Sequence, residues 1–498
     1  MNHTIVKNNQ CIPVSSIPVL DYERFLEHNI SFLREEHYHC VNFYGIQHKE
    51  KIKLICCIAN DNDATINVSS SIVESKQTLP SFSQHHFSFH IFEREIHENF
   101  EINYTDHPWL KPLRFSFNRP NNNNTIANYP FLKIDSEELH EVGVGPIHAG
   151  IIEPGHFRFI CNGEQILHLE IQLGFQHRGI ETLFLEKKKL LQRTALAESI
   201  AGDTVTGHTT AFVNLWESLC NYKTEPDLQF ARTIALELER IAIHTGDLSA
   251  MCTDVAYQLG SSVYGRLRTP VINYFQVWCG NRLAKGLIRP GKNNFSFNKI
   301  LGDSLIKIFD EYEPDFNEIS SMTFTLPTVL ARFEKTGVLT PEHAASIGAV
   351  GMIARTSGIN RDIRTSHPHD FYSTLHHQAI IKRHGDVYSR AQIRKEEILQ
   401  SIKYIRELTK TIPEENKNRK PLNPPMPDSF AISLVEGWRG EICHCAITDE
   451  QGELMHYKVK DPSLHNWLGL ALAVRNNEIS DFPICNKSFD LSYCGHDL

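Results

Sequence analysis

Two stretches that cannot form regular structure decide how this chain of 498 residues can fold. "NRPNNNNTIANYP" (residues 118–130) is rich in Asn and Pro, which favour turns over helices and strands. "PEENKNRKPLNPPMPDS" (residues 413–429) contains too much Pro for a helix interior or a central strand. We therefore predict that residues 116–130 link an N-terminal domain, residues 1–115, to a larger domain, residues 131–498.

Short apolar runs predict strands near both ends of the chain. "KIKLICCIA" (residues 51–59) has the pattern of a buried strand, and the apolar residues 87, 89 and 91 alternate as in a half-buried one. After residue 430 strand and loop patterns return. There, "GEICHCAIT" predicts a strand with Cys443 and Cys445 on the same face.

Helical periodicity dominates the middle of the chain. Residues 177–199 and 227–251 carry apolar side chains at helical spacing, and Ser389 is a suitable N-cap for a helix that reaches residue 412. The expected fold is therefore a small α+β domain followed by a helix-rich core with β-strands at its edges.

Composition excludes several classes of protein. The net charge of −9 argues against nucleic acid as a partner, because phosphate backbones are bound by concentrated basic faces. The first ten residues lack the pattern of a secretory signal, and no apolar run approaches the ~18 residues that span a bilayer. The twelve cysteines include no C-x-x-C, so we expect reduced thiols and no iron–sulfur cluster or structural zinc.

Six motifs follow one another in an order that resembles a family of redox subunits. "FEREIHENFEINYTDHPWLKPLRF" (residues 92–115) is similar to the signature of the small hydrophilic subunit of respiratory complex I. The others resemble the large subunit of energy-converting [NiFe] hydrogenases and its complex I counterpart: "GPIHAGIIEPGHFRF" (145–159), "FQHRGIETL" (175–183), "LELERIAIHTGDL" (236–248), "ARTSGINRDIR" (354–364) and "VEGWRGEI" (435–442). The ending "NKSFDLSYCGHDL" (486–498) corresponds to that subunit's metal-ligand segment.

The resemblance covers the chain from about residue 85 to the C-terminus. It implies a fusion of the two subunits, as in formate hydrogenlyase-type proteins. The implied fold is an α+β N-terminal domain followed by a mainly helical domain, similar to the [NiFe]-hydrogenase large subunit, with peripheral β-strands.

The cysteines that hold nickel in the hydrogenases are missing here. Counting back from His208 in "ESIAGDTVTGHTTAF" (198–212), the first C-x-x-C falls on Ala201 and Thr204, and in the C-terminal segment only Cys494 remains. Nickel and iron in such a site need several thiolates. The resemblance therefore implies a cavity without a Ni-Fe centre, and we expect this chain to bind no metal. Complex I uses the corresponding cavity for quinone with the help of a Tyr, but residues 198–212 include none.

The resemblance also assigns roles to polar residues. Glu153 matches a proton-relaying Glu in the loop that reaches the cavity, and His177 and Arg178 start the helix that faces a neighbouring subunit's iron–sulfur cluster. Asp203 and His208 could form an acid–base pair, although capping of a broken helix explains Asp203 almost as well. The candidate catalytic residues are Glu153, His156, Asp203, His208, Asp362 and Arg364, and the candidate cofactor-binding residues are His148, His177, Arg178, Thr204 and Arg355.

Three of these charges lie in an apolar segment that contains Gly: Arg355, Asp362 and Arg364. Because buried charges are costly unless paired, they predict a polar cavity wall or an ion-pair chain. The end of a surface helix is the alternative.

The leading interpretation is an oxidoreductase subunit, NADH:quinone oxidoreductase-like or hydrogenase-like, that is active only within a complex. It would pass electrons from the iron–sulfur cluster of a small partner subunit to a quinone or another acceptor. Antiporter-like membrane subunits would hold it peripherally at the cytoplasmic face of the cell membrane. A non-catalytic coupling or scaffold subunit is the alternative, and a true hydrogenase large subunit is the third.

Overall fold

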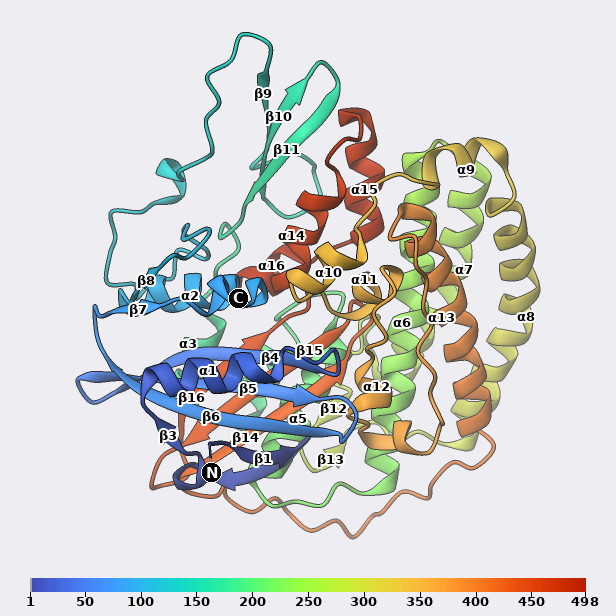
Figure 1. Ribbon diagram of the computed structural model, residues 1–498. Helices are drawn as coiled ribbons and strands as arrows, with labels where there is room; N and C mark the ends of the chain where they lie inside the picture. The colour runs from blue at the N-terminus through green and yellow to red at the C-terminus, as the bar shows by residue number, and fades with distance from the viewer. Residues whose placement is uncertain (1) are drawn as a thin grey trace.

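The computed structural model describes residues 2–498, and its N-terminal part is built on one antiparallel sheet (Figure 1). The strands run in the order β1-β6-β5-β4, with β3 pairing in parallel with β6. Helices α1 (Tyr22–Phe32) and α2 (His90–Phe100) pack with this sheet. The strand bounds are β1 (Thr4–Lys7), β3 (Val19–Leu20), β4 (Tyr38–His48), β5 (Lys51–Asn60) and β6 (Thr65–Glu74).

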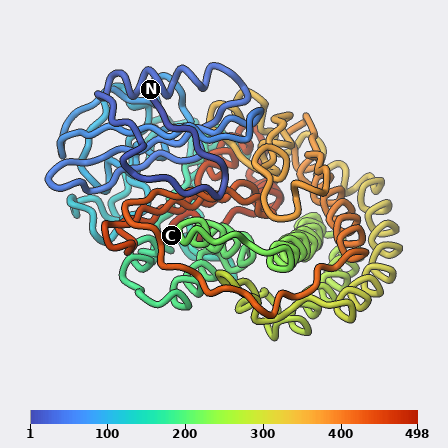
Figure 2. Tube along the Cα trace, turned by 90° about the horizontal axis from the view of Figure 1, so that it is seen from below, coloured from blue at the N-terminus to red at the C-terminus, as the bar shows by residue number. Residues whose placement is uncertain are grey.

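A second antiparallel sheet lies against the first one. Its order is β16-β15-β14-β2, formed by β14 (Ser429–Glu436), β15 (Glu441–Thr448), β16 (Leu454–Lys460) and β2 (Gln10–Pro13). Figure 2 shows the orange strands of this sheet beside the blue N-terminal strands. One apolar core joins the two sheets, with Val41, Ile55 and Cys57 on one side and Leu434, Cys443 and Cys445 on the other. The chain's first strands thus share a core with its last ones.

This arrangement corrects one expectation. The strands after residue 430 were expected at the edge of the helical part, but every residue of β14 and β15 is buried between the N-terminal sheet and α5 (Val205–Leu219). A strand buried on both faces reads as a continuous apolar run, which periodicity cannot place relative to the rest of the fold. The expected domain boundaries near residues 115 and 131 stay a prediction.

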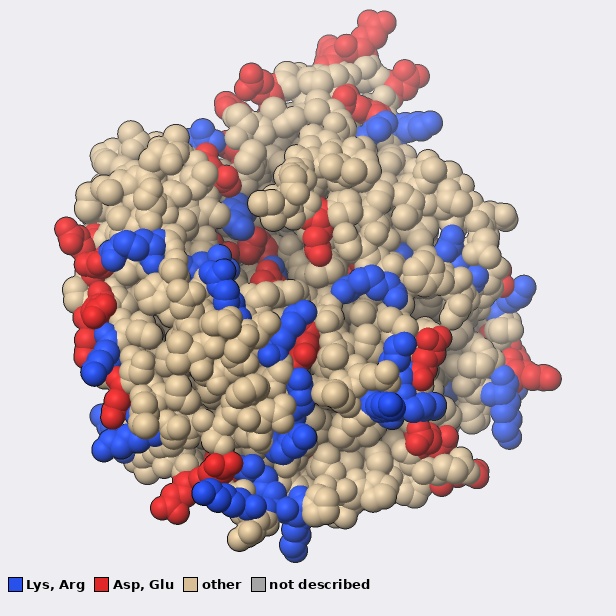
Figure 3. Space-filling view, turned by 180° about the vertical axis from the view of Figure 1, so that it is seen from behind, with Lys and Arg blue, Asp and Glu red and all other residues tan. Residues whose placement is uncertain are grey.

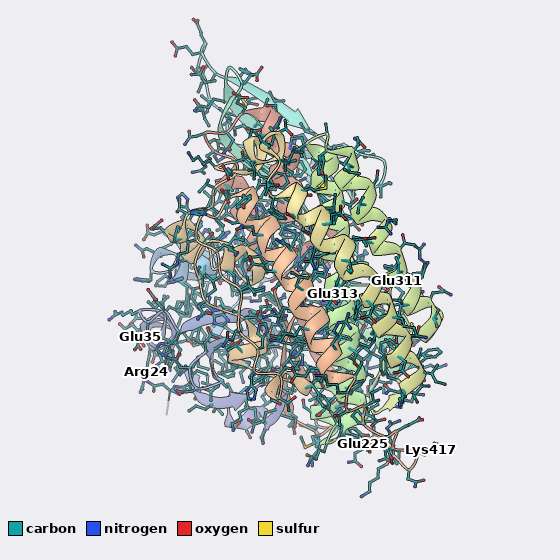
Figure 4. The ribbon with its side chains drawn as sticks, turned by 90° about the vertical axis from the view of Figure 1, so that its right-hand side faces the viewer. Arg24, Glu35, Glu225, Glu311, Glu313 and Lys417 are labelled. Carbon is teal, nitrogen blue, oxygen red and sulfur yellow. The ribbon has the colours of Figure 1, made fainter. Side chains whose placement is uncertain are left out.

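Long helices form the other half of the molecule. The bundle consists of α6 (Pro226–Asp254), α7 (Gln258–Cys279), α8 (Lys299–Thr323) and α13 (Val387–Leu408). Pro226 lies in the first turn of α6, where a backbone N–H would have no partner within the helix, so the missing N–H of Pro costs nothing. In Figure 4, α8 lies beside α13, and Glu313 of α8 sits at their contact, where it accepts hydrogen bonds from Arg406.

The irregular segment predicted at residues 413–429 runs past the lower end of the bundle, where Glu225 and Lys417 are labelled in Figure 4. Arg419 of this segment pairs with Glu225 at 3.0 Å. None of the helices formed by residues 2–498 combines the length and the apolar character needed to cross a membrane.

A small three-stranded sheet projects from the body, with the order β11-β10-β9. Its strands are β9 (His140–Val144), β10 (His156–Asn162) and β11 (Gln165–Gln172). Acidic side chains gather at its projecting end in Figure 3. The loop of residues 145–155 joins the antiparallel strands β9 and β10 and runs on the side of the C-terminus.

Three local predictions were wrong. Residues 177–199 form two helices, α3 (Ile180–Glu186) and α4 (Leu190–Ala197), because the backbone is extended at Lys187 and Lys189. Residues 87–89 form a 3-10 turn that leads into α2, since a five-residue alternation is too short to exclude a helix. The N-cap of α13 is Asp386, whose carboxylate accepts a hydrogen bond from the Ser389 N–H at 2.8 Å.

Short elements complete the fold. The C-terminal end adds α14 (Ser463–Ala473), α15 (Phe482–Phe489) and α16 (Tyr493–Asp497), although only strands and loops were expected there. The others are α9 (Pro327–Phe333), α10 (Pro341–Ser346), α11 (Gly351–Thr356), α12 (Ile363–Ser366), β7 (Thr78–Pro80) with β8 (Asn103–Thr105), and β12 (Ile288–Arg289) with β13 (Lys292–Asn293).

Candidate functional site

Several predicted site residues meet around the C-terminal segment, residues 490–498, which lies beside α2 in Figure 1. The Asp497 carboxylate accepts hydrogen bonds from the backbone N–H groups of Gly174 and Gln176 at 2.9 and 2.8 Å. The ring of His177 bonds the Asp497 carbonyl at 2.8 Å, and the backbone N–H of Arg178 bonds the Leu498 carbonyl at 2.8 Å. The chain end therefore fixes the segment that leads into α3.

The Arg178 side chain ties three segments together. Its guanidinium donates to the carbonyls of Ser199 and Ile200 at 2.6 and 2.8 Å and to that of Cys494 at 3.1 Å. The Nε of Arg178 is buried without a hydrogen-bond partner in the chain. Arg178 thus joins the start of α3 to Ser199 and Ile200, which follow α4, and to the C-terminal segment.

The loop of residues 145–155 reaches the same place. One Glu153 oxygen accepts the backbone N–H of Cys494 at 3.0 Å, and the His148 ring lies 3.4 Å from the Tyr493 hydroxyl. Burial lowers the pKa of His148 and raises that of Tyr493. His156 is not part of this group, because it lies on β10 against Phe131, with the ring centroids 5.2 Å apart.

Beside this loop, Ile147 and Ile151 are among the most exposed large apolar side chains, with 85% and 98% exposure. Such exposed apolar groups on a loop that also carries paired polar residues are typical of a contact surface.

Asp203 and His208 do not form the acid–base pair that the sequence suggested. Arg439 holds both oxygens of Asp203 at 2.6 Å and also donates to the Thr204 hydroxyl at 3.1 Å. Burial disfavours the charge of Arg439, but Asp203 outweighs this effect and raises the pKa of the guanidinium. Asp203 and Thr204 are therefore fixed by an ion pair, which sequence spacing could not show because Arg439 is more than 200 residues away.

His208 belongs to a buried hydrogen-bonded row instead. Its Nε2 lies 2.9 Å from Asp461, its Nδ1 lies 3.1 Å from Nε2 of His444, and Nδ1 of His444 lies 2.7 Å from the Tyr457 hydroxyl. Burial lowers the pKa of His444 well below its usual value. Burial opposes the charge of Asp461, but its hydrogen bond with His208 lowers its pKa to about 2. Sequence reasoning missed Asp461, His444 and Tyr457.

The three charges of the apolar segment lie in a buried ion-pair network, here called the inner network. Arg355 contacts Glu397 at 2.6 Å and Glu436 at 2.8 Å, and Arg364 holds Asp362 at 2.7 and 3.0 Å. The network consists of Glu237, Arg240, His244, Arg355, Asp362, Arg364, His377, Glu397 and Glu436. These charges therefore do not lie at the end of a surface helix, which was the alternative. Their catalytic roles stay predictions.

The sequence contained a signal for the members of this network on α6. Glu237, Arg240 and His244 of the network, and Asp247 beyond it, follow one another at intervals of three, four and three residues, which places them on one side of a helix. All four are buried, although polar residues on one side of a helix usually mark its solvent face.

A cleft of about 670 Å³ lies where the N-terminal part meets α3 and β16, and is here called the junction cleft. His177, Arg178 and Leu498 line one side of it. Five buried polar atoms of its lining have no hydrogen-bond partner among residues 2–498: Tyr44 hydroxyl, Glu95 Oε2, Arg114 Nη2, Arg178 Nε and His456 Nε2. These atoms are shielded from solvent, but the cleft is also lined by charged side chains that are partly or fully exposed, among them Arg178, Glu181 and Glu186.

The residues present do not fit a nickel–iron centre. Ala201 is fully buried and carries no ligand atom, and the Thr204 hydroxyl is engaged by Arg439. Cys494 is the one thiol of residues 490–498, whereas such a centre is held by several thiolates. Among residues 2–498, no group of three or more His, Cys, Asp or Glu side chains is placed to hold a metal ion.

Two family models match separate parts of the chain. Residues 257–429 match the family described as "Respiratory-chain NADH dehydrogenase, 49 Kd subunit", and residues 22–132 match "Respiratory-chain NADH dehydrogenase, 30 Kd subunit". The chain is 29% identical to the carbon monoxide-induced hydrogenase of Rhodospirillum rubrum, over 70% of the chain and 97% of that protein.

Two other relatives extend the likeness. The chain is 30% identical to an NADH-quinone oxidoreductase subunit of Dehalococcoides mccartyi, over 70% of the chain and 96% of that protein. It is 26% identical to formate hydrogenlyase subunit 5 of Escherichia coli, over 75% of the chain and 66% of that protein. The relatives thus include both quinone oxidoreductase and hydrogenase subunits, and both family matches occur in one polypeptide.

Proposed function

The chain belongs to the family of this Dehalococcoides NADH-quinone oxidoreductase subunit, and we propose that it carries electrons within a membrane-associated redox complex. In this proposal a small iron–sulfur protein of the complex supplies the electrons, and a quinone or another acceptor receives them. Antiporter-like membrane subunits hold the chain at the cytoplasmic face of the cell membrane.

The junction cleft is the proposed docking face for the iron–sulfur subunit, and it is the observation that carries the proposal. Its lining combines an exposed apolar side chain, Phe117, with the charged side chains of Glu181 and Glu186. An apolar centre with a polar rim is the usual composition of a protein–protein interface. His177 and Arg178 lie in this lining, so the proposed electron entry is at the start of α3.

The acceptor side is proposed at the loop of residues 145–155. His148 and Tyr493 present a ring nitrogen and a hydroxyl 3.4 Å apart, and Glu153 lies in the same loop. Hydrogen bonds of this kind suit the carbonyl oxygens of a quinone headgroup, and the exposed Ile147 and Ile151 suit its apolar surroundings. Tyr493 then supplies the hydroxyl that residues 198–212 lack.

The same proposal holds that no Ni-Fe centre takes part, because Ala201 and Thr204 supply no thiolate. Elemental analysis of the purified complex tests it. We expect iron from the partner subunit, much less than one nickel per chain, and reduction of a quinone analogue by the complex. About one nickel per chain would restore the hydrogenase interpretation.

A scaffold without redox activity is the second candidate. It is favoured by the tight packing beside Gly202 and Asp203, where the remaining cavity measures only about 10 Å³. His208→Gln separates the two candidates. For an electron carrier that uses His208 in proton delivery, we expect an assembled complex with turnover lowered about tenfold or more. Assembly without any acceptor-dependent turnover in the parent complex would favour the scaffold.

A further inference from the structure

The charges of the inner network do not balance. It contains four carboxylates, on Glu237, Asp362, Glu397 and Glu436, but three guanidinium groups, on Arg240, Arg355 and Arg364. All seven side chains are 0–1% exposed. A buried charge without a counter-charge is strongly unfavourable, and a proton is the simplest way to remove it.

We infer that the inner network holds one exchangeable proton in the folded chain near neutral pH, and that the side chain of Glu436 carries it. This inference concerns proton binding in the interior and stands apart from the proposed electron path. A proton binds to one carboxylate oxygen and leaves the network with equal numbers of positive and negative charges.

Glu436 is the carboxylate with the fewest charged partners. It has one guanidinium contact, with Arg355 at 2.8 Å, and it accepts the backbone N–H of Ile363 at 3.1 Å. Glu397 contacts Arg355 at 2.6 Å, Arg364 at 3.0 Å and Arg240 at 3.4 Å. Burial and the nearby Asp362 raise the pKa of Glu436 to about 7, whereas the pKa of Glu397 lies well below its usual value because three arginines outweigh its burial.

The other two carboxylates are also poorer places for the proton. Asp362 contacts Arg364 at 2.7 Å and Arg355 at 3.2 Å and bonds the His377 ring at 3.0 Å. Glu237 accepts hydrogen bonds from the hydroxyls of Tyr372 and Ser401, which favour its charged form. Burial lowers the pKa of the two histidines, that of His244 to about 4, so neither takes the proton readily.

The ring of His39, near Glu436, is a second possible site for the proton. Glu441 stands opposite Glu436 in the β14–β15 pair, where it contacts Lys460 and bonds the His39 ring at 2.7 Å. His39 also faces Asp61, which Arg361 holds at 2.9 Å. Burial opposes the charge of His39, but Asp61 and Glu441 outweigh it and raise its pKa. A proton on His39 is therefore the alternative that an experiment must separate from one on Glu436.

The network also has a route toward the candidate site. The charged side of α6 runs from Glu237 to Asp247, about 15 Å at 1.5 Å per residue. Asp247 pairs with Arg394 at 2.9 Å and lies next to Asp490, whose carboxylate is 3.8 Å from the Arg439 guanidinium that holds Asp203. Charged groups thus connect the proton-binding site with the stretch around His208.

The pH dependence of unfolding of the full chain tests the inference, with Glu436→Gln compared with the parent. An acid whose pKa is higher in the folded state binds more protons there than when unfolded, so the free energy of unfolding falls as pH rises. For Glu436 this fall begins near its ordinary pKa of 4.5 and ends near 7. Gln cannot titrate, so the variant lacks this fall. The ratio of the parent's unfolding equilibrium constant to that of the variant should therefore rise about 300-fold between about pH 4.5 and pH 7.

Three further variants serve as controls for this experiment. Glu237→Gln removes another carboxylate and balances the network, so it should lose the same slope even where Glu436→Gln fails to fold. Glu313→Gln, on the surface of the bundle, should keep the parent's slope. His39→Gln tests the competing site. If both Glu436→Gln and Glu237→Gln keep the parent's fall in unfolding free energy with pH, or if only His39→Gln loses it, the inference is wrong.

Infrared spectroscopy adds a readout that needs no unfolding. A buried protonated carboxylic acid has its own carbonyl stretch. Burial also raises the pKa of Glu93, Glu239 and Asp247 to about 7, so the band should be present at about pH 6, lost above about pH 8, and weaker by one acid in Glu436→Gln. The absence of this band at the lower pH would overturn the inference even where both network variants fail to fold.

Discussion

The junction cleft and the inner network are both lined by charged side chains, but one is open and the other closed. Around the cleft, Arg178, Glu181 and Glu186 are partly or fully exposed beside about 670 Å³ of open space. In the inner network each carboxylate contacts at least one arginine, and all members are buried. An open polar lining can be completed by another molecule, whereas a closed one must balance its own charges. The two regions therefore have different tasks, docking in one and proton binding in the other.

The largest effect is expected from Arg355→Met. It removes the guanidinium that contacts Glu436, Glu397 and Asp362, and the carboxylates are left buried with less compensation. We expect the free energy of unfolding of the full chain to fall by about 3–5 kcal/mol, measured by denaturant titration. Arg266→Met is the control, because Arg266 pairs with Asp315 at the exposed surface and should cost under about 1 kcal/mol. Equal losses would mean that the inner network is not a closed unit.

The same substitution in both regions sharpens the comparison. Tyr372 donates a hydrogen bond to Glu237 in the inner network, whereas the Tyr44 hydroxyl lies behind the cleft, in the core between the two sheets, where a weakly bonding Cys445 thiol is its neighbour. Tyr372→Phe should therefore lower the free energy of unfolding by about 1.5–3 kcal/mol, because a bond to a charged group is lost. Tyr44→Phe should change it by less than about 0.5 kcal/mol. A large loss for Tyr44→Phe in the free chain would show that the chain itself satisfies this hydroxyl.

The smallest effect concerns Phe117→Ala in the assembled complex. Phe117 lines the junction cleft and is 68% exposed in the free chain. If the iron–sulfur subunit docks there and buries this ring, its removal should weaken binding of that subunit about fivefold or more, or about 1 kcal/mol. The dissociation constant of the purified subunit measures this, and folded Tyr372→Phe should bind as the parent does. Unchanged binding in Phe117→Ala would argue against docking at this face of the cleft.

The sequence predicted individual helices and strands better than it predicted how they pack together. The helix predicted over 227–251 is α6, and the strand predicted over 51–59 is β5. The pairing of β2 with β14 could not be predicted, because it joins residues 10–13 to residues 429–432 through backbone hydrogen bonds that carry little sequence signal.

The candidate site shows the same limit. The resemblance assigned Glu153 to a loop that reaches the cavity and Arg178 to a helix start, and both residues bond Cys494 of the C-terminal segment, a contact that the sequence did not predict. The partners that hold the other candidates, Arg439 for Asp203 and Asp461 for His208, lie more than 200 residues away. Their distance in the chain leaves no spacing pattern, so only the fold could identify them.

Hydrogen–deuterium exchange of the chain, free and in its complex, tests the division of tasks most directly. Exchange reports how often a backbone amide opens to solvent. Docking should slow exchange in the segments that line the junction cleft, at residues 44–47, 95–100 and 177–183, and leave α6 and α13 unchanged, since both are already closed in the free chain. Unchanged exchange around the cleft, with protection elsewhere on the surface, would contradict the account.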